Sequence, residues 1–359
     1  MRARIVCLPG DGTGPEVIKE AIRVLTSVAC AFDHSFTFID EKFGESAFQT
    51  YGKSVPEKTL EACKAADAIL LGSFSKTSIS TQNITLNSMS LLQSGLNMHT
   101  GLQLCQNVHA AESAPSFGGG VDNNTEIALV WPLPDTAEPP ATLENDTVHD
   151  TISLSPTQAE LVLRAAFRLA RERRRSLCGT FSSTLPAAKQ LWHTTALRVA
   201  TDFPDVSARW LEAEQCAAEL VTRSSYFDVL LVDSMQKPVF AGIAAGLSGS
   251  FNLSPCVMLG DTSPMIYLPA NEPDASLAGR DMASPIAMIL SAALMLRKSL
   301  QLNKEADCVE MAVRNVLNAG WRTADLARSG EPRVGTEAIG KLIAEQVDTA
   351  GAVMASFRR

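Results

Sequence analysis

Residues 8–17 read Leu-Pro-Gly-Asp-Gly-Thr-Gly-Pro-Glu-Val, and this stretch decides the fold. The apolar residues Ile5 to Leu8 that lead into it are typical of a buried strand, and the glycines at 10–14 predict a tight turn. Pro15 suits the first turn of a helix, where its missing N–H has no partner to lose. From Val17 onward the apolar residues recur at helical spacing. The stretch therefore predicts a strand, a turn and a helix in direct succession.

The same alternation continues along the chain. Short apolar runs predict further strands at 36–39, 67–72, 127–131 and 227–232. Helical periodicity predicts helices at 57–65, 156–174, 187–201, 285–300 and 336–356. Strands that alternate with helices are typical of a mostly parallel α/β sheet. Residues 113–150 are rich in Ser, Gly, Pro, Asn and Thr outside their one strand, which indicates loops and a projecting arm.

Length and composition narrow the class of protein. A chain of 359 residues with 46% apolar and 19% charged residues is expected to form a compact body of two domains. Its net charge of −8 argues against nucleic acid as a partner. The most apolar stretch, 284–296, is too short to cross a bilayer, so no membrane is expected. Because a strand begins at once and no signal segment is evident, we expect a cytoplasmic protein.

Two local features have structural explanations. The eight cysteines are scattered without a CxxC pair, so reduced cysteines in the core are expected, and no zinc site. The one basic run, 171–175, is interpreted as the solvated last turn of a helix, where cations suit the helix dipole.

Several segments together resemble the decarboxylating β-hydroxyacid dehydrogenases, the family of isopropylmalate and isocitrate dehydrogenases, and most of all isopropylmalate dehydrogenase. They are residues 8–17, 43–45, 51–62, 66–72 and 283–297. The resemblance implies two α/β domains, one made of 1–98 with 255–359 and the other of 99–254. It also implies an arm at about 113–155 and a homodimer built through the middle domain. Each active cleft would then be completed by the partner subunit.

The resemblance also implies a chemistry. Members of this family oxidise a 2-hydroxy acid with NAD(P) and then decarboxylate the product. A divalent metal held by aspartates polarises the developing alkoxide and enolate. A lysine and a tyrosine handle protons, and three arginines hold the carboxylates.

This chain departs from the family at the positions that carry that chemistry. The two metal-binding aspartates of one subunit fall on Pro238 and Gly242, which have no side-chain oxygen, and the partner's carboxylate falls on Glu214. The lysine position falls on Ser182, and the tyrosine position lies near Glu138.

The positions of the three arginines fall on His99, His109 and Trp131. A charge-assisted hydrogen bond contributes roughly 1.5–3 kcal/mol, so losing three removes on the order of 5–9 kcal/mol of carboxylate recognition. Histidine recovers part of this only when it is protonated, and it lacks the two-pronged guanidinium. Tight binding of a dicarboxylate is therefore not expected.

The cofactor loop is altered as well. Its histidine and glycine positions read Asn271 and Glu272, and the ribose-binding aspartate falls on Ser276 unless a two-residue shift brings in Asp274. The adenine-side asparagine falls on Ser284. The 10–14 turn lacks the spacing of a dinucleotide-binding loop. We therefore expect neither NAD(P) nor a metal as cofactor.

The replacements remove permanent charge and add aromatic surface, which favours a less charged small molecule held by a few polar groups. The candidate catalytic residues are His99, His109, Trp131, Glu214, Asp233 and Lys237. The candidate substrate contacts are Gln93, Met98, Gln103, Ser182 and Met235. For each histidine, an exposed or structurally bonded side chain is an equally simple explanation, as is core packing for Trp131.

Three functions remain open from the sequence. The leading hypothesis is a metal-free, redox-neutral enzyme that cyclises or isomerises an apolar small molecule, or catalyses a pericyclic step. Such reactions need one reactive conformer and a few hydrogen bonds at developing charge. The alternatives are a non-catalytic regulatory subunit of a family heteromer and an NAD-dependent decarboxylating dehydrogenase with an unusual substrate.

Overall fold

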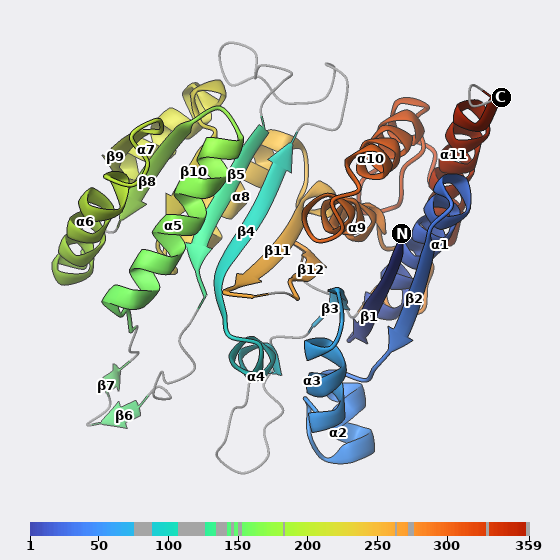
Figure 1. Ribbon diagram of the computed structural model, residues 1–359, viewed down its shortest axis with the longest axis horizontal. Coiled ribbons are helices and arrows are strands. Elements are labelled where there is room, and N and C mark those ends of the chain that lie inside the picture. The colour runs from blue at the N-terminus through green and yellow to red at the C-terminus, as the bar shows by residue number, and fades with distance from the viewer. Residues whose placement is uncertain are drawn as a thin grey trace.

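The computed structural model describes residues 1–74, 88–106, 126–133, 142–144, 147–149, 153–181, 184–262, 264–271, 276–327 and 330–356. One ten-stranded sheet runs through the molecule in the order β2-β1-β3-β12-β11-β4-β5-β10-β8-β9 (Figure 1). Its strands are β1 (Arg2–Gly10), β2 (Ser35–Asp40), β3 (Ala68–Ser73), β4 (Met98–Gln106), β5 (Glu126–Pro132), β8 (Ser176–Phe181), β9 (Ser207–Glu212), β10 (Val229–Val232), β11 (Pro255–Gly260) and β12 (Ile266–Pro269). A separate antiparallel pair joins β6 (Thr142–Glu144) to β7 (Thr147–His149).

Helices cover both faces of the sheet (Figure 1). The helices are α1 (Gly14–Phe32), α2 (Glu45–Tyr51), α3 (Glu57–Lys64), α4 (Ser88–Gly95), α5 (Pro156–Glu172), α6 (Pro186–Ala200), α7 (Ala213–Thr222), α8 (Lys237–Ser248), α9 (Ile286–Lys298), α10 (Asn303–Asn318) and α11 (Thr336–Ser356). Two short 3-10 turns are η1 (Ser224–Tyr226) and η2 (Phe251–Leu253). In the described part of the chain, no helix combines the length and apolar character that crossing a membrane requires.

The sheet is parallel at both ends and antiparallel in the middle. β1 pairs in parallel with β2 and β3, and β10 pairs in parallel with β5 and β8. By contrast, β11 runs antiparallel to both β12 and β4, and β4 runs antiparallel to β5. The predicted α/β class with a mostly parallel sheet flanked by helices is confirmed. The predicted division at 98/99 and 254/255 falls where β4 and β11 begin, and as a division into domains it stays a prediction.

Side chains that alternate along each strand build two cores, one on each face. Ile5 and Cys7 of β1 lie in the core under α1, α5, α6, α9, α10 and α11. Val6 and Leu8 lie in the other core, under α3, α4, α7 and α8. This is the two-residue period of a strand that is buried on both faces.

The opening strand, turn and helix are present as predicted. Gly10 has a φ of +73°, and a Cβ added there would lie 1.6 Å from the backbone oxygen of Ser73 on β3. Asp11 donates its backbone N–H to that oxygen at 3.0 Å, and Ser73 Oγ donates to Asp11 O at 2.7 Å. Pro15 lies in the first turn of α1. Only glycine permits the turn to pass this close to β3.

Two expectations need correction in part. The basic run is exposed at Arg171, Arg174 and Arg175, as expected, but Arg173 reaches inward and pairs with Glu126 at 2.6 Å and with the buried Asp228 at 2.8 Å. The helix α5 ends at Glu172, so Arg173 lies just beyond its last turn. The Arg173 guanidinium therefore anchors the link between α5 and β8. Cys30 is exposed, whereas the other seven cysteines are buried and all eight are free thiols.

Candidate functional site

Trp131 and Lys237 meet on the α8 face of the sheet. Trp131 is the next-to-last residue of β5 and lies directly opposite Gly101 of β4, and a Cβ added to Gly101 would lie 2.2 Å from the indole. The ring therefore lies over the glycine, with only 8% of the residue exposed. Lys237 begins α8, and its Nζ lies 4.9 Å from the centroid of that ring. The indole is thus held between the strand and the ammonium group.

A cavity of about 100 Å³ opens beside this pair. Its lining residues include Phe74, Met258 and Asn271. The side-chain oxygen of Asn271 is buried and has no hydrogen-bond partner among the described residues. The Lys237 ammonium likewise makes no hydrogen bond or ion pair within the described ranges. An apolar cavity with an ammonium group and an unsatisfied amide can hold a small apolar group and stabilise nearby negative charge.

Cys256 also lines the cavity but is no nucleophile. Burial raises the pKa of its thiol to about 12, so it stays protonated at neutral pH. Burial likewise raises the pKa of the neighbouring Cys105 to about 11. Both thiols therefore act as small apolar groups, and Lys237 is the charged side chain in the described lining of the cavity.

Three predicted substrate contacts are buried on this same face. Met98 packs in the α8-side core, and Gln93 donates its side-chain amide to Met258 Sδ at 3.3 Å. Gln103 is fully buried, and its Oε1 has no partner among the described residues. The structure thus places them in the core beside the cavity, and none of them lines it.

His99 lies on the opposite face of the sheet. The β4–β11 pairing is irregular at this point, since Leu259 pairs with Thr100 but Gly260 pairs with Met98. The irregularity directs His99 to the same side as Thr100, whose Oγ1 lies 2.7 Å from the imidazole Nδ1. Burial lowers the pKa of His99, opposed by Asp261, whose carboxylate lies 3.4 Å from Nε2. His99 is therefore separated from Trp131 by the sheet and lines a different hollow.

Asp233 and Met235 follow the end of β10 and line a third hollow of about 580 Å³. Its walls are largely apolar and include Leu133 and Trp192. Asp233 Oδ1 accepts the backbone N–H of Gln236 at 2.9 Å, so this carboxylate shapes the turn into α8. The structure brings these two residues together but apart from His99.

The remaining candidate residues either do not line these hollows or lie outside the described residues. Glu214 is exposed in the first turn of α7 and lines none of them. His109, Ser182 and the tyrosine position near Glu138 lie outside the described residues, as do Glu272 and Asp274.

The metal positions that the resemblance assigns lie in the first turns of α8. Pro238 has no donor atom, and a Cβ added to Gly242 would meet nothing within 4 Å. Across the described ranges, no three His, Cys, Asp or Glu side chains gather where they could share a cation. The residues present at these positions do not fit a divalent metal.

Ser284, at the position that the resemblance assigns to the adenine-side asparagine, also has a structural role. Ser284 is buried, its backbone N–H donates to Asp325 Oδ2 at 2.9 Å, and its Oγ accepts from Ile286 N at 3.3 Å. These bonds satisfy free N–H groups at the start of α9. The hydroxyl of Ser284 therefore stabilises the helix end.

Sequence reasoning missed Gly101, Met258 and Asn271 as parts of the site. The strand β4 was not predicted, because its polar residues and Gly101 hide the apolar alternation, and the short apolar run that forms β11 was also missed. A signal was available for Gly101, since glycine inside a strand often marks a close approach by another group.

The chain matches the family described as isocitrate/isopropylmalate dehydrogenase over residues 4–343. It is 33% identical over 351 residues to a 3-isopropylmalate dehydrogenase of Gloeobacter violaceus, covering 95% of this chain and 97% of that one. A 3-isopropylmalate dehydrogenase of Nitratidesulfovibrio vulgaris is 32% identical over 361 residues, covering 97% of this chain and all of the relative.

Solved structures agree on the fold. An isocitrate dehydrogenase from Methylococcus capsulatus superposes with a TM-score of 0.83 at 22% identity, covering 96% of this chain and 99% of that one. A beta-decarboxylating dehydrogenase from Thermococcus kodakarensis gives 0.80 at 23% identity, covering 97% and 96%. With the matching sequence and the shared sheet together, the chain belongs to the isocitrate/isopropylmalate dehydrogenase family.

Proposed function

We propose that this chain uses the dehydrogenase fold for a metal-free, redox-neutral reaction on an apolar small molecule of low charge, a cyclisation, an isomerisation or a pericyclic step. The observation that carries the proposal is the start of α8. There Pro238 and Gly242 stand at the positions assigned to metal-binding aspartates, while Lys237 stacks on Trp131. A site without these ligands has lost the means to polarise a hydroxy acid.

In this proposal the cavity beside Trp131 holds one apolar end of the substrate. The indole supplies a flat surface that selects one conformer of the bound molecule. The Lys237 ammonium stabilises negative charge that develops on a carbonyl or enol oxygen, and the Asn271 amide is a second polar anchor. Neither contribution requires a cofactor.

The proposed assembly is a homodimer built through residues 99–254. Support comes from large apolar side chains left exposed on α7, on α8 and in the segments leading to α8. They are Val221, Tyr226, Met235 and Val239. A dimer would also give Glu214 a role in the partner's cleft. We expect Val239→Glu to weaken the dimer in sedimentation velocity and Leu197→Glu, on α6, to leave it unchanged.

The decisive test restores the metal positions. Thermal unfolding of wild type with Mg²⁺ and 3-isopropylmalate should show no Mg²⁺-dependent shift in Tm, whereas Pro238→Asp/Gly242→Asp should gain one. The two carboxylates would lie one helical turn apart, and Gly242 leaves room for a side chain. Gly246→Asp is the matched control, because a Cβ there also meets nothing within 4 Å. A Mg²⁺-dependent shift in wild type would contradict the proposal.

A second candidate is an NAD-dependent decarboxylating dehydrogenase with an unusual substrate. It is favoured by the names of the relatives, which are 3-isopropylmalate dehydrogenases that match nearly the whole chain. The discriminating assay is nicotinamide absorbance with wild type, NAD⁺, Mg²⁺ and a panel of 2-hydroxy acids. Turnover that Lys237→Met abolishes would favour this candidate over a redox-neutral enzyme.

A further inference from the structure

A further hollow lies on the face of the sheet opposite α8. It is a groove of about 930 Å³ lined by residues of α5, α9, β4 and β11. Figure 1 shows α5 and α9 on either side of these two strands. The floor of the groove is apolar, formed by Leu102, Leu104, Val257, Leu259, Leu290 and Leu294. This volume is within the range of sites that bury most of a small organic ligand. Trp131, Lys237 and Asn271 do not line this groove.

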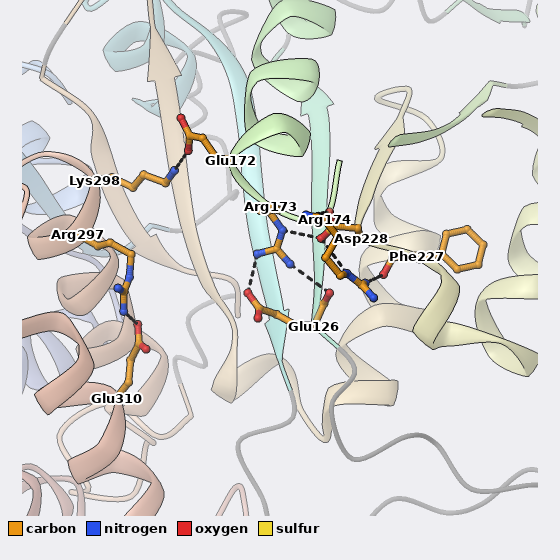
Figure 2. Close-up of polar contacts among 9 residues, drawn as sticks. All are labelled: Glu126, Glu172, Arg173, Arg174, Phe227, Asp228, Arg297, Lys298 and Glu310. Atoms are coloured by element: carbon orange, nitrogen blue, oxygen red, sulfur yellow. Dashed lines mark hydrogen bonds and ion pairs between the residues drawn. The ribbon is translucent and has the colours of Figure 1, made fainter. Parts of the chain in front are cut away.

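Most of the lysine and arginine side chains that line the described part of this groove are held in ion pairs. Figure 2 shows Lys298 of α9 meeting Glu172 of α5 and Arg173 reaching Glu126, with N···O distances of 2.6 Å in both pairs. Four of the five lysine and arginine residues along the described lining are neutralised in this way. Those four and their partners are Arg164 with Glu160, Arg173 with Glu126, Arg297 with Glu310, and Lys298 with Glu172.

Arg168 is the fifth cation. It lies on the exposed side of α5, lines the groove, and has no hydrogen bond or ion pair among the described residues. It also lies near enough to His99 that its charge helps to lower the pKa of that imidazole. Arg168 thus supplies a positive charge without a partner among the described residues, beside the His99–Asp261 pair and above the apolar floor of the groove.

We propose that this groove is a binding site for an amphipathic monocarboxylate, with the carboxylate on Arg168 and the apolar chain on the floor of β4, β11 and α9. A guanidinium that lacks a carboxylate partner is the natural complement of one. Extended apolar surface beside a single uncompensated cation favours one anionic head and an aliphatic or aromatic body. A dicarboxylate would place its second charge on the leucine floor.

A bound ligand of this kind would connect two neighbouring parts of the molecule on one face of the sheet. It would contact α5 and β4 on one wall of the groove and α9 and β11 on the other. The ion pair Lys298–Glu172 already links the two helices. Because the ligand binds the folded state and not the unfolded one, it should raise the Tm of the protein, and a tighter ligand should raise it more at the same concentration. This site is independent of the reaction proposed for the opposite face.

Calorimetric titration with decanoate tests the proposal, with decanol as the uncharged analogue. Wild type should bind decanoate about tenfold more tightly than decanol, the fold-change expected for one charge-assisted hydrogen bond at a partly exposed site. Arg168→Gln should remove this preference. Arg314→Gln should retain it, because Arg314 is an exposed arginine on α10 that does not line the groove and has no ion pair among the described residues. Ala165→Trp places a large side chain into the groove and should abolish binding of both compounds.

Three results would each overturn the proposal. They are absence of decanoate binding to wild type, equal affinities for decanoate and decanol, and binding that survives Ala165→Trp. Circular dichroism and Tm of the unliganded variants establish that each is folded. Arg168→Gln is expected to keep the wild-type Tm, because its side chain has no partner to lose among the described residues.

Discussion

Replacing Gly101 by alanine tests how the candidate site is built. The new methyl group would lie 2.2, 2.4 and 2.6 Å from three atoms of the Trp131 indole. These are atoms of a rigid ring, and the ring is buried between β4 and the Lys237 ammonium, so the whole side chain must move. Overpacking of this kind costs about 1–3 kcal/mol, and loss of the cation–π contact adds about 0.5–1 kcal/mol.

We therefore expect Gly101→Ala to lower the free energy of unfolding by about 1.5–4 kcal/mol in urea titrations. In a Trp131→Leu background the same substitution should cost less than about 0.5 kcal/mol, because the clashing ring is gone. Gly246→Ala is the control, since its Cβ meets nothing within 4 Å and the change should stabilise α8 by about 0.5–1 kcal/mol. Equal costs of Gly101→Ala in the two backgrounds would refute the packing argument.

Three further predictions concern charge. Asp228→Ala should cost about 3–5 kcal/mol in urea titrations, because it leaves the largely buried Arg173 without a carboxylate it now contacts at 2.8 Å; a cost below 1 kcal/mol would contradict this. Burial raises the pKa of Glu310 above 4.5, so wild type should gain stability relative to Glu310→Gln as the pH falls through that raised pKa, and Tm against pH for both proteins checks the sign. Burial lowers the pKa of His99 below 6.5, so wild type should lose stability relative to His99→Gln as the pH falls below 6.5; parallel Tm curves would show that the imidazole is not desolvated.

Much of the fold could be predicted because local signals and tertiary packing agree. The glycine turn at 10–14, the proline that starts α1 and the long amphipathic helices α5 and α11 carry their own structural preferences. The strand β4 could not be predicted. It lies at the centre of the sheet, where segments distant in the sequence bury even a polar residue such as Gln103.

The candidate site was less predictable than the fold. Trp131 and Lys237 do meet, since one lies next to the last residue of β5 and the other begins the helix that follows the adjacent strand β10. His99 was expected beside them and lies on the other face, because one irregularity in the pairing of β4 changes the side to which a side chain points. No sequence pattern around residue 99 predicts that irregularity.

By itself the sequence determined the α/β class and the position of several main elements, among them the opening strand, turn and helix. These follow from periodicity, turn chemistry and residue type, which act over a few residues. Only the tertiary structure decided which of the candidate residues share a hollow, that Arg173 is anchored by Asp228, and that Arg168 faces a groove without a partner in the described chain. These depend on strand pairing and helix packing between segments far apart in the sequence, and on the desolvation that such packing produces.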